Sequence, residues 1–554
     1  MLTGAEAVAR LLRKAGVRRA YGVPGQRVLP LFAALAEENV PVVVTRHEQG
    51  ASFMADVYAR LGGMGCIVTT SGPGGINALA GVASAFMDSV PLIVLTAQAE
   101  VAEFGRYGIQ EGSGLGRTPD VRQIFAATTK ASFQPRTVDK LVDAVAEALA
   151  LAVRGRPGPV HIDVPSDLLT DKVAAGLVEE LAAGAPAPAA VPEPAAELIR
   201  EVAGRIRSAK SPLLLIGNGV VRGGAVTAAQ QVARHGSMWI AHSFLAKGAF
   251  DETNAAVLGP VGVFGTEAAN RALHDEADLV VAVGVAFSYL TTSGWPARLG
   301  GGRLIRCDLD QRELGTNYTD GVNIHADARV FLESLATELA TSDEGNAPLG
   351  PDLKARYPDL RAPEESAALH PIRVCDVVGE WIAENTTVVA DVGQNAYWVE
   401  RHLKTRGGGR FIINGGLGAM GHGVAGCLGA WHAGQDAGRP GPVLCTTGDG
   451  GFMMGALEVS TAVSEGADVT WIIFNNGTLG TQKEWYVRQG ASGSEMDLPD
   501  TDYVALASAM GARAFRATTE EELREALGSA GAHSGPTVID VVIDPVPAPT
   551  VFGS

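Results

Sequence analysis

Two apolar strands that each end in polar residues impose the strongest constraint on the fold of this chain. Residues 443–447 predict a buried strand that runs into a Gly-Asp-Gly-Gly turn at 448–451, and residues 469–474 predict a second strand that ends in two asparagines. Such glycines permit a tight turn whose N–H groups face an anion, and ligands bind at the carboxyl edge of a parallel sheet. Asp449 and Asn476 therefore predict Mg²⁺ beside a bound phosphate group.

The same alternation of short apolar strands and helices continues along the whole chain. Its 554 residues are too many for one hydrophobic core. The pattern predicts an α/β fold with three doubly wound parallel-sheet domains, at residues 1–181, 197–339 and 366–554. Segments rich in Ala, Pro, Gly and polar residues, at 182–196 and 340–365, are expected to link them.

Charge and composition exclude several classes of function. A net charge of −17 without any basic block argues against nucleic-acid binding. Without a run of 18 apolar residues, no membrane-spanning segment is expected, and residues 1–12 predict a capped amphipathic helix rather than a targeting peptide. The five scattered cysteines indicate buried, inert thiols in a reducing compartment, so a cytoplasmic location is expected.

The Gly-Asp-Gly-Gly turn, followed at this distance by two asparagines, resembles the diphosphate–metal signature of thiamine-diphosphate enzymes. The whole chain resembles the acetolactate synthase branch of that family. The resemblance implies a pyrimidine-binding, a central and a diphosphate-binding domain, in this order. It also implies that Asp449, the Asn476 side chain and the Thr478 carbonyl hold Mg²⁺ on the cofactor diphosphate, with Gly450 and Gly451 beside the cofactor.

Glu48 follows the strand predicted at residues 41–45 and opens a helix. By itself, such a residue is more often an acid that stabilises the helix dipole by a fraction of a kcal/mol. In the resembling family, the glutamate at this place hydrogen-bonds the cofactor aminopyrimidine and favours its imino tautomer. Because the metal motif is present in the same chain, the catalytic role is favoured for Glu48, and Gln110 is expected near the reacting carbon.

Two further glycine-rich segments match cofactor contacts of the family. The first segment, at residues 416–421, is compatible with a plain helix start and a core methionine. The resemblance instead places Met420 beneath the cofactor and the Gly418 carbonyl on its aminopyrimidine. In the second, Gly393, Gln394 and Asn395 resemble a diphosphate-binding turn. Asn395 stands where the family usually has histidine, and it is still expected to donate to phosphate.

Other positions depart from acetolactate synthases and concern the substrate and flavin. Gln26 replaces a glycine, and Thr481 and Gln482 replace apolar residues ahead of Trp485, which keeps the family's spacing. All four are expected in the substrate pocket, and the three replacements predict a more polar one. The central block has nucleotide-binding features at residues 217–220 and 308–310. The Arg-Phe-Asp-Asp-Arg run used near flavin is here Ala-Phe-Ser-Tyr-Leu, at 286–290, so bound FAD is not expected.

The expected function is decarboxylation of a 2-oxo acid such as pyruvate, with transfer of the resulting carbanion to an acceptor carbonyl. One alternative is a non-ligating decarboxylase or lyase, or a transferase that uses an unusual acceptor. Another is a non-catalytic nucleotide-binding or regulatory protein on the same scaffold. The family pairs the first domain of one chain with the third domain of its partner, so a homodimer or homotetramer with shared active sites is expected.

Overall fold

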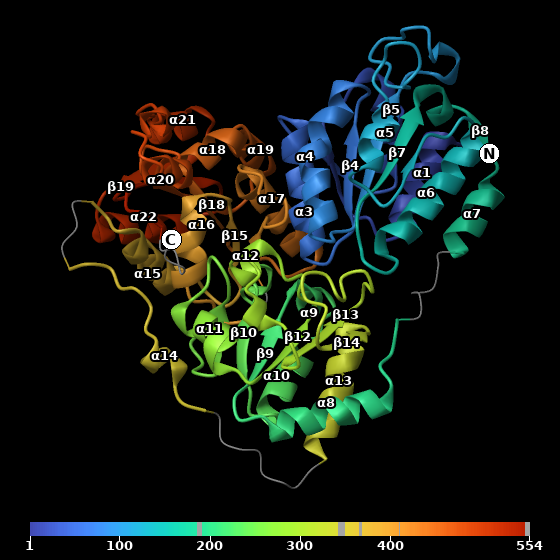
Figure 1. The fold of residues 1–554 in the computed structure, drawn as a ribbon. Helices are drawn as coiled ribbons and strands as arrows, with labels where there is room; N and C mark the ends of the chain where they lie inside the picture. Colours follow the sequence, from blue (N-terminus) through green and yellow to red (C-terminus); the bar gives the residue numbers. More distant parts are fainter. Residues whose placement is uncertain (185–190, 342–349, 365–367, 409, 549–554) are drawn as a thin grey trace.

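The computed structural model describes residues 1–184, 191–341, 350–364, 368–408 and 410–548. These residues form three α/β domains, each built on a sheet of six parallel strands, which confirms the predicted fold class. Figure 1 shows the domains as three lobes, coloured from blue through green to red along the chain. The domain boundaries stay predictions, and parts of both predicted linkers lie outside the described residues.

The N-terminal sheet has the strand order β3-β2-β4-β5-β7-β6, and every neighbouring pair is parallel. Apolar runs that are buried on both faces make up its central strands, as expected for a sheet covered by helices on either side. Its strands are β2 (Ala20–Gly22), β3 (Val42–Val44), β4 (Gly65–Thr69), β5 (Leu92–Gln98), β6 (Ser132–Phe133) and β7 (Val160–Pro165). The helices that matter for the site are α3 (Glu48–Arg60) and α4 (Pro73–Met87).

The central sheet has a different order, β11-β10-β9-β12-β13-β14. The chain therefore builds outward from β9 in one direction and then from β12 in the other, the doubly wound arrangement of nucleotide-binding domains. Its strands are β9 (Pro212–Ile216), β10 (Trp239–His242), β11 (Val257–Pro260), β12 (Leu279–Val283), β13 (Leu304–Asp308) and β14 (Val322–His325).

The C-terminal sheet has the order β16-β15-β17-β18-β20-β19. Counted along the chain within each domain, the first and third sheets both follow 2-1-3-4-6-5, so these two domains share one topology, which sequence comparison of the two segments does not reveal. The strands are β15 (Thr387–Ala390), β16 (Phe411–Ile413), β17 (Val443–Gly448), β18 (Val469–Asn475), β19 (Arg513–Ala517) and β20 (Thr537–Val542).

The N- and C-terminal domains of the same chain pack through α3 and α17 (His422–Asp436). A side chain at Gly429 would come within 2.1 Å of the Met54 carbonyl oxygen, so glycine permits this close approach. One buried polar contact also crosses between the two helices: Asp56, which binds the Arg60 guanidinium of its own helix at 3.0 Å, contacts His422 Nε2 at 2.5 Å. This packing fixes where each domain can present its part of a site.

Residues 449–465 form two short helices, α18 (Asp449–Gly455) and α19 (Glu458–Glu465), rather than one. Gly455 ends α18 where a side chain would come within 2.8 Å of Val424, and a helix-weakening glycine at this contact explains the break. The amphipathic first helix is confirmed as α1 (Gly4–Lys14), with Thr3 as its N-cap.

The five cysteines are buried and form no disulfide, in agreement with the expectation of inert thiols. Among the described residues, every helix falls short of the length and apolar character that a membrane crossing requires.

Candidate active site

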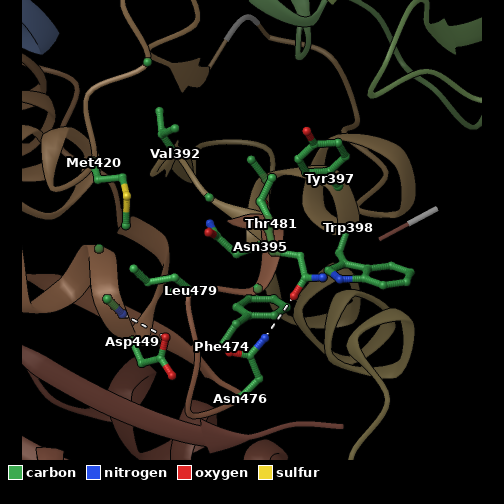
Figure 2. A pocket seen from close by; sticks show the side chains of 18 of the residues that line it. Val392, Asn395, Tyr397, Trp398, Met420, Asp449, Phe474, Asn476, Leu479 and Thr481 are labelled. Carbon is green, nitrogen blue, oxygen red and sulfur yellow. Dashed lines mark hydrogen bonds between the residues drawn. The ribbon is translucent and has the colours of Figure 1, made fainter. Parts of the chain in front are cut away.

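A cavity of about 260 Å³ opens at the carboxyl edge of the C-terminal sheet (Figure 2). It lies where the strand order reverses beside β15, next to β17, which is the usual ligand position in a doubly wound sheet. This C-terminal cavity brings together twelve of the residues that the sequence singles out: Gly393, Gln394, Asn395, Gly418, Met420, Asp449, Gly450, Gly451, Asn476, Thr478, Thr481 and Gln482.

Asp449 is the charged group of the C-terminal cavity. It is 3% exposed, and among the described residues no lysine, arginine or histidine pairs with it. Burial raises the pKa of this carboxyl, while hydrogen bonds from the Gly450 N–H at 2.8 Å and the Gly477 N–H at 2.7 Å oppose the rise. A buried carboxylate without a counter-ion is costly, so these residues fit a bound cation.

Asn476 lies beside Asp449 because β18 ends next to β17. Its side-chain N–H donates to Gln394 Oε1 at 2.9 Å, a bond drawn in Figure 2, and its Oδ1 accepts from the Thr478 N–H at 3.2 Å. The carboxylate of Asp449 and the amide oxygen of Asn476 are the hard oxygen donors that Mg²⁺ prefers. The donor chemistry therefore fits a magnesium ion that also uses phosphate oxygens and water.

Asn395 is oriented differently from the sequence expectation. Its Nδ2 donates to the Asp391 carbonyl at 3.0 Å and the Thr446 carbonyl at 3.2 Å, so the network fixes the orientation of the amide. Its Oδ1 is buried and has no partner among the described residues. In this orientation Asn395 offers an acceptor to the C-terminal cavity, and the glycine turn around it supplies the donors for an anion.

Glycines and Met420 shape the rest of the C-terminal cavity. A side chain at Gly451 would come within 2.3 Å of the Asp391 carboxylate, and one at Gly450 within 2.6 Å of Leu479. The Met420 methyl group would lie 3.6 Å from a Cβ atom built on Gly450. Gly418 adopts φ 73°, a conformation that favours glycine. The cradle is open because side chains are missing there, and a flexible thioether forms one wall.

Glu48 is in the N-terminal domain and does not line the C-terminal cavity. It is the first residue of α3 and is 8% exposed, and its Oε2 accepts from Asn77 Nδ2 at 3.0 Å. A side-chain atom built on Gly74 would lie 3.4 Å from Glu48 Oε1. Asn77 therefore anchors one carboxylate oxygen, and glycine leaves room beside the other.

The remaining predicted residues divide between the two domains. The exposed Gln110 has φ 56°, a strained conformation for a side-chain-bearing residue, and its Oε1 accepts from Ser71 Oγ at 3.2 Å. Gln26 is exposed at the same edge of the N-terminal sheet, next to the Gly25–Thr70 contact. Trp485 is 62% exposed on α20 (Gly480–Arg488) and lies outside the C-terminal cavity that Thr481 and Gln482 line.

Sequence reasoning assigned no site role to four large residues of the C-terminal cavity: Phe264, Leu290, Tyr397 and Trp398. Tyr397 and Trp398 lie one helical turn after Gly393 on α16 (Gln394–His402), so helical spacing from the glycine turn is a signal for them. Phe264 and Leu290 belong to the central domain and reach the cavity only through domain packing. No local pattern identifies such residues.

A second, larger cavity of about 1220 Å³ lies where the three domains meet. It borders the carboxyl ends of β9 and β12, where Gly217 approaches Gly284 so closely that a side chain would be 1.8 Å from its carbonyl oxygen. The space accommodates a dinucleotide. The 286–290 run places the uncharged Ala286, Ser288, Tyr289 and Leu290 on its wall. The expected absence of flavin stays a prediction.

Comparison with known proteins agrees with this architecture. Models of the N-terminal, central and C-terminal domains of thiamine pyrophosphate enzymes match residues 2–115, 199–335 and 391–541. A probable acetolactate synthase large subunit of Methanocaldococcus jannaschii is 32% identical, with 99% of this chain and 93% of that protein covered.

The acetolactate synthase of Mycobacterium bovis is 31% identical, with 98% and 88% covered, and the large subunit of Parasynechococcus marenigrum is 32% identical, with 98% and 87% covered. The family models match a large part of each of the three domains, and these relatives extend over nearly the whole chain. It therefore belongs to the thiamine pyrophosphate enzymes, in their acetolactate synthase branch, and is a thiamine-diphosphate-dependent enzyme.

Proposed function

We propose that this enzyme decarboxylates a 2-oxo acid, most simply pyruvate, and transfers the remaining acyl unit to an acceptor carbonyl. The observation that carries the proposal is the unpaired, buried Asp449 beside Asn476 in a glycine-lined cavity. This donor set suits Mg²⁺ on the cofactor diphosphate. The names of the related acetolactate synthases support the reaction class.

Each group of residues has a distinct part in this proposal. Asp449, Asn476 and the Thr478 carbonyl hold the metal, and Gly393, Gln394, Gly450 and Gly451 form the wall against the diphosphate. Met420 and Gly418 support the cofactor rings. Bound thiamine diphosphate supplies the carbanion chemistry. Glu48 holds a proton at the aminopyrimidine, and Gln110 lies near the reacting carbon with Gln26 at the substrate end.

We also infer that the active site is completed between two copies of the chain. Glu48 does not line the C-terminal cavity, and the turn that precedes it is bound by Glu458 of its own chain, which accepts from the Arg46 and His47 N–H groups at 3.2 and 3.1 Å. Apolar side chains on α4, α18 and the turn before α19 are exposed in the single chain: Ile76, Phe86, Met87, Met453, Met454 and Leu457. Such a surface supports at least a homodimer.

Product identification tests the proposed reaction. The purified protein is incubated with thiamine diphosphate, Mg²⁺ and a panel of 2-oxo acids, each alone and with added acceptors, and products are identified by mass spectrometry. Ligated products that need both donor and acceptor are expected. Release of the free aldehyde as the main product in every mixture would instead identify the non-ligating decarboxylase.

A further inference from the structure

Three hydrogen-bond donors on the wall of the C-terminal cavity have no partner among the described residues (Figure 2). Thr481 Oγ1 and Trp398 Nε1 are buried atoms without a hydrogen bond. The Tyr397 hydroxyl also donates to no described group, and burial raises its pKa, so it stays protonated at neutral pH. All three donors are uncharged. Unsatisfied donors in a cavity wall are expected to bind acceptor atoms of a ligand.

The wall around these donors is apolar and aromatic. Phe264 packs edge-on against Tyr397, with ring centroids 4.6 Å apart, and Leu290 from the central domain lies on the same wall. Among the described residues that line this cavity, Asp449 alone carries a formal charge, and the proposed metal uses it. The part of the cavity beyond the metal site therefore offers hydrogen bonds and apolar contact without a cation.

The chemistry of that wall discriminates between two kinds of acceptor. A carboxylate that leaves water for such a site loses several kcal/mol of hydration unless a cation and hydrogen bonds replace it. An aldehyde or ketone carries no charge, and its oxygen accepts from hydroxyl or indole donors. The wall is thus better suited to an uncharged carbonyl compound than to a second 2-oxo acid.

Arginines near the carboxyl edge of the N-terminal domain already have partners. Arg27 pairs with Glu103 at 2.8 Å and donates to Ser166, and Arg46 donates to Ser460 at 2.9 Å and to Ser464 at 2.7 Å. The side chains of Arg106 and Arg117, on the exposed loop around Gln110, form no ion pair or hydrogen bond with a described residue. These two are the candidates for binding the carboxylate of a 2-oxo acid acceptor, so variants of both are included in the test.

We propose that the acceptor substrate is an uncharged aldehyde or ketone, bound through its oxygen by Tyr397 and Thr481. The inference rests on the proposed function and names the class of its second substrate. With pyruvate as donor, the bond to the carboxylate breaks and CO₂ leaves. A new carbon–carbon bond then joins the former carbonyl carbon of pyruvate to the acceptor carbonyl carbon, and the acceptor oxygen takes up a proton to become a hydroxyl group.

Competition between acceptors measures this choice directly. The holoenzyme receives pyruvate with equal concentrations of propionaldehyde and 2-oxobutyrate, and both ligated products are quantified. We expect the aldehyde product to exceed the 2-oxobutyrate product by about tenfold or more. Preference for 2-oxobutyrate would overturn the inference and leave the proposed function standing. No CO₂ release from any 2-oxo acid would overturn both.

Variants sharpen the test. Leu290→Arg places a guanidinium on the wall and is expected to shift the product ratio at least about tenfold towards 2-oxobutyrate. Leu290→Met keeps the wall apolar and is expected to retain the wild-type ratio. Tyr397→Phe, which preserves shape, is expected to raise KM for the aldehyde several-fold more than KM for pyruvate. An unchanged ratio in folded Leu290→Arg, equal KM changes in Tyr397→Phe, or loss of 2-oxobutyrate use in Arg106→Ala/Arg117→Ala would contradict the inference.

Discussion

The N- and C-terminal domains share a strand order but present opposite kinds of site at the same edge of the sheet. In the C-terminal domain, glycines open a cavity around Asp449, whose carboxylate lacks a counter-ion among the described residues. In the N-terminal domain, Glu48 is anchored by Asn77 beside a glycine turn. One domain is built to hold a charged group, and the other to hold a single carboxylate in a fixed orientation.

This difference indicates that neither domain forms a complete active site by itself. The C-terminal cavity offers oxygen donors and glycine turns that suit a metal and a phosphate group, but its described lining contains no acid other than Asp449. The N-terminal edge provides a carboxylate, that of Glu48, whose orientation is fixed by Asn77. The proposed function therefore assigns one topology to two roles, a binding half in the C-terminal domain and a catalytic half in the N-terminal domain.

The largest effect is expected at the binding half. Asp449→Ala removes the carboxylate that is proposed to bridge metal and protein, so Mg²⁺-dependent cofactor affinity is expected to fall about 100-fold or more. Calorimetric titration of thiamine diphosphate, with Mg²⁺ and with chelator, measures it. The folded state is checked by circular dichroism, and unchanged affinity in a folded variant would contradict the metal assignment.

At the catalytic half, Glu48→Gln is expected to leave cofactor affinity within a few-fold of the wild type and to lower kcat by about 100-fold or more. The amide is nearly isosteric but cannot favour the imino tautomer as the acid does. Titration and steady-state kinetics on the same preparation separate the two quantities. Equal losses of affinity and kcat would show that Glu48 and Asp449 do not divide the roles as described.

A change of pH is expected to have a smaller effect on metal-dependent cofactor affinity than these substitutions. Burial raises the pKa of Asp449 above the ordinary value of 3.8, so the ionised carboxylate destabilises the folded apoprotein as pH rises through this window. Mg²⁺ needs the ionised form. Metal-dependent cofactor affinity should therefore fall by up to about tenfold per pH unit below the raised pKa.

Titrations across acidic pH measure this dependence. Asp449→Asn, which carries no ionisable group there, should show a weak affinity with a much flatter pH profile. A wild-type profile as flat as that of the variant would contradict proton competition at Asp449.

Added flavin is expected to have the smallest effect on turnover. The uncharged wall at 286–290 predicts that the purified protein is colourless and that added FAD leaves turnover unchanged. Absorbance after denaturation measures any released chromophore. A stoichiometric yellow flavin would refute the prediction and would assign the large interdomain cavity to the dinucleotide.

The sequence predicts most of the fold and singles out twelve residues that line the C-terminal cavity, because both depend on local patterns. Apolar runs define strands, and glycine turns at strand ends place Asp449 and Asn476 together at one edge of the sheet. The sequence does not predict that Phe264 and Leu290 line this cavity, because packing between domains brings them there. The orientation of the Asn395 amide depends on two backbone carbonyls that only the folded chain positions.

The most direct measurement of a divided, shared site is complementation between Glu48→Gln and Asp449→Ala chains. If Glu48 of one chain serves Asp449 of its partner, each heterodimer keeps one site with both groups intact. Heterodimers isolated with two different affinity tags are then expected to show about half of the wild-type turnover, while each parent homodimer stays nearly inactive. Folded, verified heterodimers without recovered turnover would contradict the shared site.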